Sequence, residues 1–168
     1  MKDGKTVAIV PGSFDPITYG HIDIATRAAE LYDKVYLAAM INDQKKYTFS
    51  IEERERIARA ALCDIPNISV ISSSGMLWKL AEELSADAIV KGYRNQTDYD
   101  YEQNMAEFNA EKNPMAKTVL LKANEKYSDL SSTVVRERMN NGDSIDGMLP
   151  KSAIEEINAI LSQRETNK

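Results

Sequence analysis

The sequence predicts a doubly wound α/β fold, in which helices cover both faces of a five-stranded parallel sheet. Short apolar runs rich in β-branched residues recur along the chain, and each is continuous, as in strands buried on both faces. Segments with helical spacing of apolar residues separate these runs, and the alternation implies right-handed crossovers between parallel strands. The expected strands are 6–10, 35–41, 68–71, 88–90 and 118–121.

Each segment between the expected strands carries helix signals of its own. Gly20-His21 opens the first helix, and Ser50 with Glu53 forms a capping box for a second helix that runs to about Leu62. Asn113-Pro114 should end the fourth helix, and a last helix should follow Pro150. The apolar stripes expected to face the core are Leu77-Leu80-Ala81-Leu84, Tyr101-Met105-Phe108 and Ile154-Ile157-Ile160-Leu161.

Length and composition favour one soluble domain. The chain of 168 residues, 43% of them hydrophobic, can bury a substantial core, so we expect a single domain over 1–168 with a frayed polar tail at about 163–168. The formal net charge of −5 argues against a general nucleic-acid-binding protein, although a pocket can still gather cations for a small anion. Cys63 is the single cysteine, which excludes an internal disulfide. We see no signal peptide and no membrane-spanning run, so no membrane association and a cytoplasmic location are expected.

Ligands of doubly wound sheets bind beyond the carboxyl ends of the strands, so the segment after the first strand is the first candidate for chemistry. It reads Pro-Gly-Ser-Phe-Asp-Pro-Ile-Thr-Tyr-Gly-His and ends at His21, the only histidine of the chain. Gly12 permits a close backbone approach, Pro16 stops the strand, and the helix that follows offers unpaired N–H groups to an anion. A histidine at a helix start is by itself more often structural. Because the whole loop is organised around His21, we interpret it as part of a phosphate site.

Other chemistries suit this loop less well. One histidine and a distant Cys63 supply too few soft ligands for a transition-metal site, so we expect no metal bound by the protein itself. No serine-centred elbow accompanies the histidine. The loop is neither a dinucleotide fingerprint nor a Walker A loop.

The pattern Gly-Ser-Phe-Asp-Pro followed by Gly-His resembles the signature of the HxGH-type nucleotidyltransferase superfamily, whose fold is Rossmann-like. Thr18 stands where the first histidine of that motif often is, and Thr-x-Gly-His is typical of the phosphopantetheine adenylyltransferases. The resemblance extends over nearly the whole chain, from Ala8 to about Leu161. It implies that His21 is catalytic, that Ser13, Phe14 and His21 bind ATP, and that Ser13 also binds the acceptor.

The segments after the second and third strands extend this resemblance. Two lysines in a turn are usually solvated, but beside a phosphate loop, and by resemblance, Lys45 would hold the phosphate of the acceptor and act in catalysis. We interpret 52–54 as helix cap and surface. Leu77 would by itself be assigned to the core, whereas the resemblance implies that it contacts the pantetheine arm.

The segment after the fourth strand, Lys-Gly-Tyr-Arg, is similar to the family pattern Arg-Gly-Leu-Arg, and Asp-Tyr-Asp-Tyr-Glu follows it. Two cations around a glycine form either a phosphate clamp or a surface turn. By resemblance Lys91 contacts the acceptor, although lysine lacks the planar fork of arginine. Arg94 is implied as catalytic and ATP-binding, and Gly92, Tyr93 and Glu102 as ATP-binding.

Hydroxyl side chains gather after the fifth strand, before an apolar helix. Such a cluster is usually an N-cap, but the same groups can grip nucleotide phosphates. The family has Ile-Ser-Ser-Ser here, and the threonine at 133 is also found in related mononucleotide adenylyltransferases and cytidylyltransferases. The ATP-binding residues implied for this segment are Tyr127, Ser128, Asp129, Leu130, Ser131, Ser132 and Thr133.

The resemblance implies an enzyme that transfers AMP from ATP to 4′-phosphopantetheine, giving dephospho-coenzyme A and pyrophosphate. It also implies that Mg²⁺ accompanies ATP and that the chain forms a homohexamer. Thr133 leaves open a related enzyme that uses nicotinamide mononucleotide or glycerol phosphate. Lys91 is the one feature that points to a non-catalytic nucleotide-binding homologue.

Overall fold

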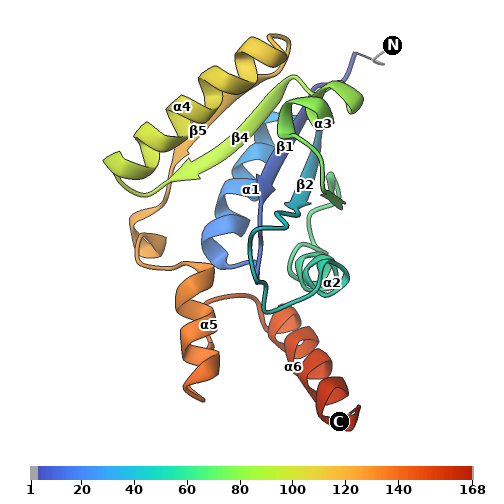
Figure 1. The fold of residues 1–168 in the computed structure, drawn as a ribbon, viewed down its shortest axis with the longest axis vertical. Helices are drawn as coiled ribbons and strands as arrows, with labels where there is room; N and C mark the ends of the chain where they lie inside the picture. Colours follow the sequence, from blue (N-terminus) through green and yellow to red (C-terminus); the bar gives the residue numbers. More distant parts are fainter. Residues whose placement is uncertain (1–3, 168) are drawn as a thin grey trace.

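A computed structural model describes residues 4–167, which form a parallel sheet between two layers of helices (Figure 1). The sheet has five strands in the order β3-β2-β1-β4-β5, and every pair of neighbours is parallel. The predicted doubly wound fold is therefore confirmed. The strands are β1 (Val7–Gly12), β2 (Lys34–Met40), β3 (Ile68–Ser73), β4 (Ala88–Tyr93) and β5 (Lys117–Lys122).

The helices begin and end close to the expected places. The capping box at the second helix is present, since Ser50 Oγ accepts from Glu53 N at 3.1 Å and Glu53 Oε1 accepts from Ser50 N at 2.8 Å. None of the helices in the described part of the chain is long and apolar enough to cross a bilayer. The helices are α1 (Tyr19–Leu31), α2 (Ile51–Ala61), α3 (Leu77–Glu83), α4 (Gln96–Lys112), the short 3₁₀ helix η1 (Glu125–Tyr127), α5 (Ser132–Asn140) and α6 (Lys151–Thr166).

Two cores lie on opposite faces of the sheet, because successive side chains of a strand point to opposite sides. Ala8 and Val10 of β1 belong to the larger core, to which α1, α2, α5 and α6 contribute. Ile9 belongs to the smaller core, which α3 covers. The chain winds outward from β1 to β3, then crosses to β4 on the other side of β1. The strand order therefore reverses between β1 and β4, and this switch point fixes where the following loops meet.

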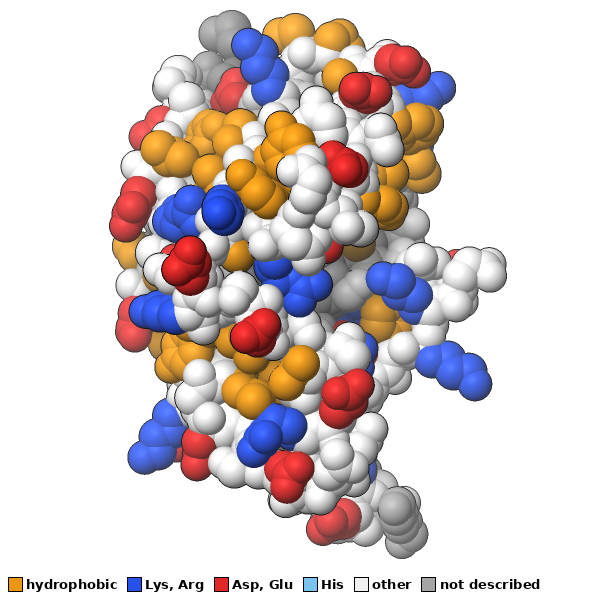
Figure 2. Space-filling view, turned by 90° about the vertical axis from the view of Figure 1, so that its left-hand side faces the viewer, with side chains coloured by type: hydrophobic (Ala, Val, Ile, Leu, Met, Phe, Trp, Pro, Cys, Tyr) orange, Lys and Arg blue, Asp and Glu red, His pale blue; other side chains and the backbone are white. Residues whose placement is uncertain are grey.

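Two expectations about the helices were wrong. The predicted stripe of α4 is not part of either core: Tyr101 is 62% exposed and Phe108 37% exposed. Figure 2 shows hydrophobic side chains gathered on the face of the molecule that carries α4. The polar tail is not frayed up to Thr166, because α6 continues to that residue. Arg164 in this last stretch donates to the Thr48 carbonyl at 2.8 Å and to Glu53 Oε1 at 2.6 Å, which ties it to the start of α2.

Candidate active site

A cavity of about 580 Å³ opens at the carboxyl ends of the strands, at the switch point between β1 and β4. Its size is typical of a small-molecule site. The segments that follow β1, β2, β4 and β5 all contribute to its wall. The predicted site residues that line it are Ser13, Phe14, His21, Lys45, Leu77, Lys91, Gly92, Tyr93, Arg94, Glu102, Tyr127, Leu130 and Ser131.

The loop after β1 is shaped by the ring of Phe14. This residue is 2% exposed and has a φ of 48°, a left-handed conformation that is uncommon outside glycine. Its ring turns back under Gly12, where an added Cβ would lie 2.9 Å from the ring. The same ring meets the imidazole of His21 edge to face, with centroids 5.1 Å apart. Phe14 therefore packs against the imidazole of His21 and also lines the cavity.

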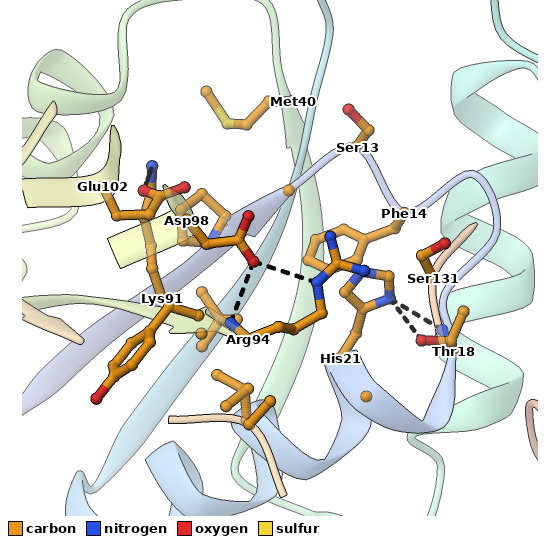
Figure 3. Close-up of a pocket in the computed structure, with 18 of the residues that line it drawn as sticks. Ser13, Phe14, Thr18, His21, Met40, Lys91, Arg94, Asp98, Glu102 and Ser131 are labelled. Carbon is orange, nitrogen blue, oxygen red and sulfur yellow. Dashed lines mark hydrogen bonds and ion pairs between the residues drawn. The ribbon is translucent and has the colours of Figure 1, made fainter. Parts of the chain in front are cut away.

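His21 is held in one orientation by the residue that caps its helix. Thr18 N donates to Nδ1 of His21 at 3.0 Å, and Thr18 Oγ1 lies 3.2 Å from the same nitrogen (Figure 3). Because Nδ1 accepts from a backbone N–H, the proton of the neutral ring is on Nε2. Burial, with a smaller contribution from the positive charge of Arg94, lowers the pKa of His21 to about 4. At neutral pH His21 is thus an uncharged hydrogen-bond donor.

The first turn of α1 is less open to an anion than we expected. Tyr19 N, one of the N–H groups assumed to be unpaired, donates to the carbonyl of Met148 at 2.8 Å. The loop before α6 therefore occupies part of this helix end. The dipole of α1 still favours negative charge here, and Gly20 and the imidazole of His21 both line the cavity at this helix start.

Ser13 and Lys45 are in contact at the wall of the cavity, where Lys45 Nζ lies 3.4 Å from Ser13 Oγ. A cation beside a hydroxyl is a suitable pair of ligands for one phosphate group. Leu77 lines the cavity as well, together with Met40 at the end of β2, and we refer to these two side chains as its apolar strip.

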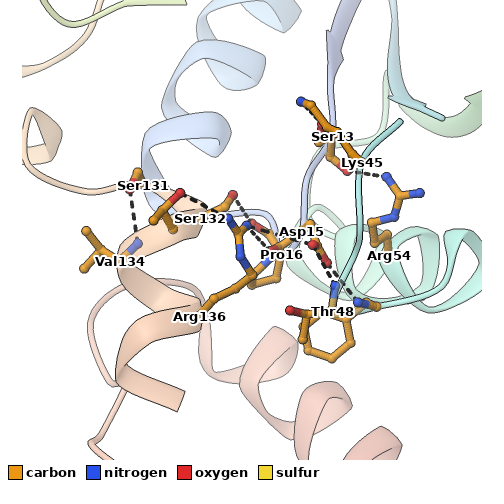
Figure 4. Close-up of polar contacts among 12 residues, drawn as sticks. Ser13, Asp15, Pro16, Lys45, Thr48, Arg54, Ser131, Ser132, Val134 and Arg136 are labelled. Atoms are coloured by element: carbon orange, nitrogen blue, oxygen red, sulfur yellow. Dashed lines mark hydrogen bonds and ion pairs between the residues drawn. The ribbon is translucent and has the colours of Figure 1, made fainter. Parts of the chain in front are cut away.

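Two buried charged residues hold the loops after β1 and β2 in place, and sequence reasoning missed both. Asp15, 2% exposed, accepts from Thr48 N at 2.9 Å and from Phe49 N at 3.0 Å (Figure 4). Arg54, also 2% exposed, donates to the Ser13 carbonyl at 2.8 Å. Interpreting 52–54 as cap and surface was therefore wrong for Arg54. Its spacing from Ile51 and Ile57, three residues on either side, was the available signal, because it puts Arg54 on the apolar face of the helix.

Lys91, in β4, and Arg94, directly after it, are each paired with a carboxylate of α4. Lys91 Nζ lies 2.7 Å from Glu102 Oε2, and Arg94 Nε lies 3.2 Å from Asp98 Oδ2 (Figure 3). Asp98 Oδ2 also accepts from Arg94 N at 3.1 Å. Asp98 contacts only Nε of the side chain, and within residues 4–167 no hydrogen bond occupies the two terminal nitrogens of Arg94, which can therefore bind a ligand. The sequence analysis included Asp98 in the Asp-Tyr-Asp-Tyr-Glu segment but gave it no role of its own.

The glycine between these cations has a packing role. Gly92 belongs to β4, together with Lys91 and Tyr93, and is not in a loop after it. A Cβ at Gly92 would lie 2.8 Å from Ile24 of α1, so glycine is needed for helix and strand to approach.

The segment 127–133 is only partly directed at the cavity. Ser131 caps α5 by accepting from Val134 N at 3.2 Å, and it also lines the cavity. Ser132 Oγ donates to the Pro16 carbonyl at 2.7 Å. Thr133 Oγ1 accepts from Arg136 Nη2 at 3.1 Å. Ser128, Asp129, Ser132 and Thr133 were predicted to bind ATP, but they do not line the main cavity.

Among residues 4–167 no group of three or more His, Cys, Asp or Glu side chains is placed to hold a metal ion. A divalent cation at this site would therefore rely mainly on oxygens of the nucleotide and of water, which suits Mg²⁺.

Comparison with known proteins agrees with this geometry. The cytidylyltransferase-like family matches residues 9–138. A phosphopantetheine adenylyltransferase of Caldanaerobacter subterraneus subsp. tengcongensis is 42% identical over 151 residues, which cover 90% of this chain and 94% of that protein. One of Lactobacillus helveticus is 44% identical over 149 residues, covering 88% and 91%. The chain therefore belongs to the cytidylyltransferase-like family and, within it, to the phosphopantetheine adenylyltransferases.

Proposed function

We propose that this chain transfers AMP from ATP to 4′-phosphopantetheine, forming dephospho-coenzyme A and pyrophosphate. The observation that carries the proposal is the set of donors that line one cavity: the uncharged imidazole of His21, the Ser13–Lys45 pair and Arg94. Two phosphate-bearing substrates need such a site, with cations for the phosphates and a donor for the reacting group. The identity of the relatives supports the choice of acceptor.

In the proposed reaction, an oxygen of the 4′-phosphate attacks the α-phosphorus of ATP, and the bond to the leaving pyrophosphate breaks. The attacking phosphate is already anionic, so no general base is required. Catalysis then depends on position and on stabilising the charge that develops on the α-phosphate oxygens. The Nε2–H of His21 would donate to one of these oxygens.

The remaining roles follow from the position of each side chain. Ser13 and Lys45 would bind the acceptor phosphate, and the terminal nitrogens of Arg94 would bind the β- and γ-phosphates, with Ser131 near them. The apolar strip that includes Leu77 would accommodate the uncharged pantetheine arm. Mg²⁺ would arrive with the triphosphate as part of the substrate and keep most of its waters. We assign these roles to a single domain that works in the cytoplasm, where ATP is available.

The exposed apolar side chains around α4 support the proposal of a homo-oligomer, for which we retain the homohexamer. Tyr101 and Phe108 on α4 are exposed, and hydrophobic side chains gather on the face of the molecule that carries α4 (Figure 2). An exposed apolar patch of this kind commonly marks a protein interface. Sedimentation of the purified chain measures the number of subunits.

The proposed activity is tested by pyrophosphate release from ATP with each of three acceptors: 4′-phosphopantetheine, nicotinamide mononucleotide and glycerol phosphate. We expect release with the first, and a kcat/KM at least about a hundredfold lower with the others, because they lack the arm that fills the apolar strip. Release that is faster with either of the other acceptors would refute the choice of acceptor. No release with any of them would refute the enzymatic proposal.

A further inference from the structure

Arg54 is a buried cation without a carboxylate partner. Its side chain is 2% exposed, in the first turn of α2. No Asp or Glu within residues 4–167 forms an ion pair with it, and its buried Nε has no hydrogen-bond acceptor there. A charge in such a place is costly unless other groups compensate it. The contacts of Arg54 therefore indicate what it does.

One guanidinium joins three segments of the chain. Nη1 of Arg54 donates to the carbonyl of Ser13 at 2.8 Å and to the carbonyl of Met40 at 3.3 Å. Its planar group lies 3.8 Å from the centroid of the Tyr47 ring. Ser13 follows β1, Met40 ends β2, and Tyr47 lies in the loop between β2 and α2. Lysine could not make this set of contacts, since it lacks the planar fork.

Tyr47 extends the connection to Lys45. The Tyr47 hydroxyl accepts from Asn42 N at 3.0 Å, and Lys45 N donates to the Asn42 carbonyl at 3.0 Å. These two bonds close the loop 42–47 at its base, with Lys45 near its tip. Ser13 and Lys45, which meet at 3.4 Å, are thus both fixed with respect to Arg54.

We propose that Arg54 is a positioning residue for the acceptor phosphate. It sets the spacing between Ser13 and Lys45, so that both can bind the same phosphate group. Its charge, which no carboxylate of the described chain neutralises, adds to the attraction for a phosphate dianion. Arg54 does not line the cavity, and no bond links it to His21 or Arg94, so its effect falls on the acceptor more than on ATP. The inference rests on the proposed function, because it assumes that Ser13 and Lys45 bind the acceptor.

The test compares Arg54→Met and Arg54→Lys with wild type, and uses Arg59→Met on the same helix as a matched control. Arg59 is an exposed arginine that pairs with Glu55 at 2.8 Å. The measurements are kcat, KM for each substrate, melting temperature, and calorimetric binding of 4′-phosphopantetheine without ATP. We expect Arg54→Met to raise KM and Kd for the acceptor by about ten- to a hundredfold, the range for losing hydrogen bonds from a charged group. KM for ATP should change by less than about threefold, with Arg54→Lys intermediate and Arg59→Met unchanged.

The other possible results refute either the role of Arg54 or the proposed function. Equal increases in both KM values, or a lower melting temperature with unchanged acceptor binding, would mean that Arg54 is only structural. If Arg54→Met does not fold, Arg54→Lys decides, and an acceptor Kd equal to that of wild type overturns the proposal. A wild-type protein that neither binds nor adenylylates phosphopantetheine refutes the proposed function and this role with it. A wild type that does both, with unchanged variants, refutes the role of Arg54 alone.

Discussion

The two halves of the cavity hold their cations differently. On the side of β1 and β2, Lys45 and Arg54 contact a hydroxyl, two carbonyls and an aromatic ring, and no ion pair to either occurs in the described chain. On the side of β4, Lys91 and Arg94 are each paired with a carboxylate of α4. The first half is positively charged before any ligand arrives, whereas the second is close to neutral.

This difference indicates how the two phosphate groups are bound. A monophosphate dianion is small and must bind where charge is already uncompensated. A triphosphate arrives with its own metal ion, so it needs orientation more than additional positive charge. Arg94, held through Nε and with no partner for its terminal nitrogens in the described part of the chain, suits the second task. His21 lines the same cavity as an uncharged donor, and its removal should affect the reaction more than the binding of either substrate.

His21→Ala should therefore show the largest effect. Loss of one preorganised donor to the transition state lowers kcat by about 10²–10³-fold. KM for both substrates should stay within about threefold of wild type, because the cations on each side remain. His21→Gln, whose amide can present an N–H near the position of Nε2, should recover part of kcat. A near-normal kcat for His21→Ala in steady-state assays would show that the donor lies elsewhere.

The lowered pKa of His21 predicts a loss of stability in acid. In the unfolded chain the imidazole has a pKa of 6.5, and in the folded protein about 4. Between these values the unfolded state binds more protons, so the free energy of unfolding falls as the pH drops from 6.5 towards 4. The full contribution of His21 is at most about 3 kcal/mol, and it is present above pH 6.5.

Urea denaturation at pH 7 and at pH 4.5 measures this loss. The variant His21→Gln serves as the control, since it keeps every carboxylate of the protein but has no imidazole. The difference between the two proteins in their loss of stability isolates His21. Equal losses would contradict an imidazole that is uncharged in the folded protein.

Asp98→Ala tests whether the paired half is organised by its carboxylates. The Arg94–Asp98 pair is partly exposed, with side chains 42% and 32% accessible, so its contribution is modest. We expect KM for ATP to rise about two- to fivefold, because Arg94 loses the group that orients it. KM for the acceptor should not change. A fall in KM for ATP would instead mean that Asp98 competes with the triphosphate for Arg94. The carboxylates of α4 would then weaken ATP binding and would not organise this half of the cavity.

The sequence was sufficient for the sheet and for the places where chemistry occurs. Continuous apolar runs identify buried strands, and parallel strands bring the segments after them to one edge. The failures came from properties that depend on tertiary contacts. Arg54 was assigned to the surface by its charge, although its helical position is that of a core residue. The stripe of α4 is periodic, but periodicity does not say what covers it. Ser132 has the hydroxyl expected of a phosphate ligand, but that hydroxyl donates to the Pro16 carbonyl of a distant loop.

Thr133→Ser should have the smallest effect. Thr133 was the sequence feature that favoured a different acceptor, but its hydroxyl accepts from Arg136, and the residue does not line the cavity. Serine keeps that hydroxyl, so the ratio of kcat/KM between phosphopantetheine and the two other acceptors should change by less than about twofold. Ser131→Ala is the variant to compare with it. Because Ser131 lines the cavity, we expect this substitution to raise KM for ATP. A tenfold change of acceptor preference in Thr133→Ser would place position 133 in contact with a substrate. Acceptor choice would then depend on the residues at the start of α5, and not on Ser13 and Lys45, whose spacing Arg54 sets.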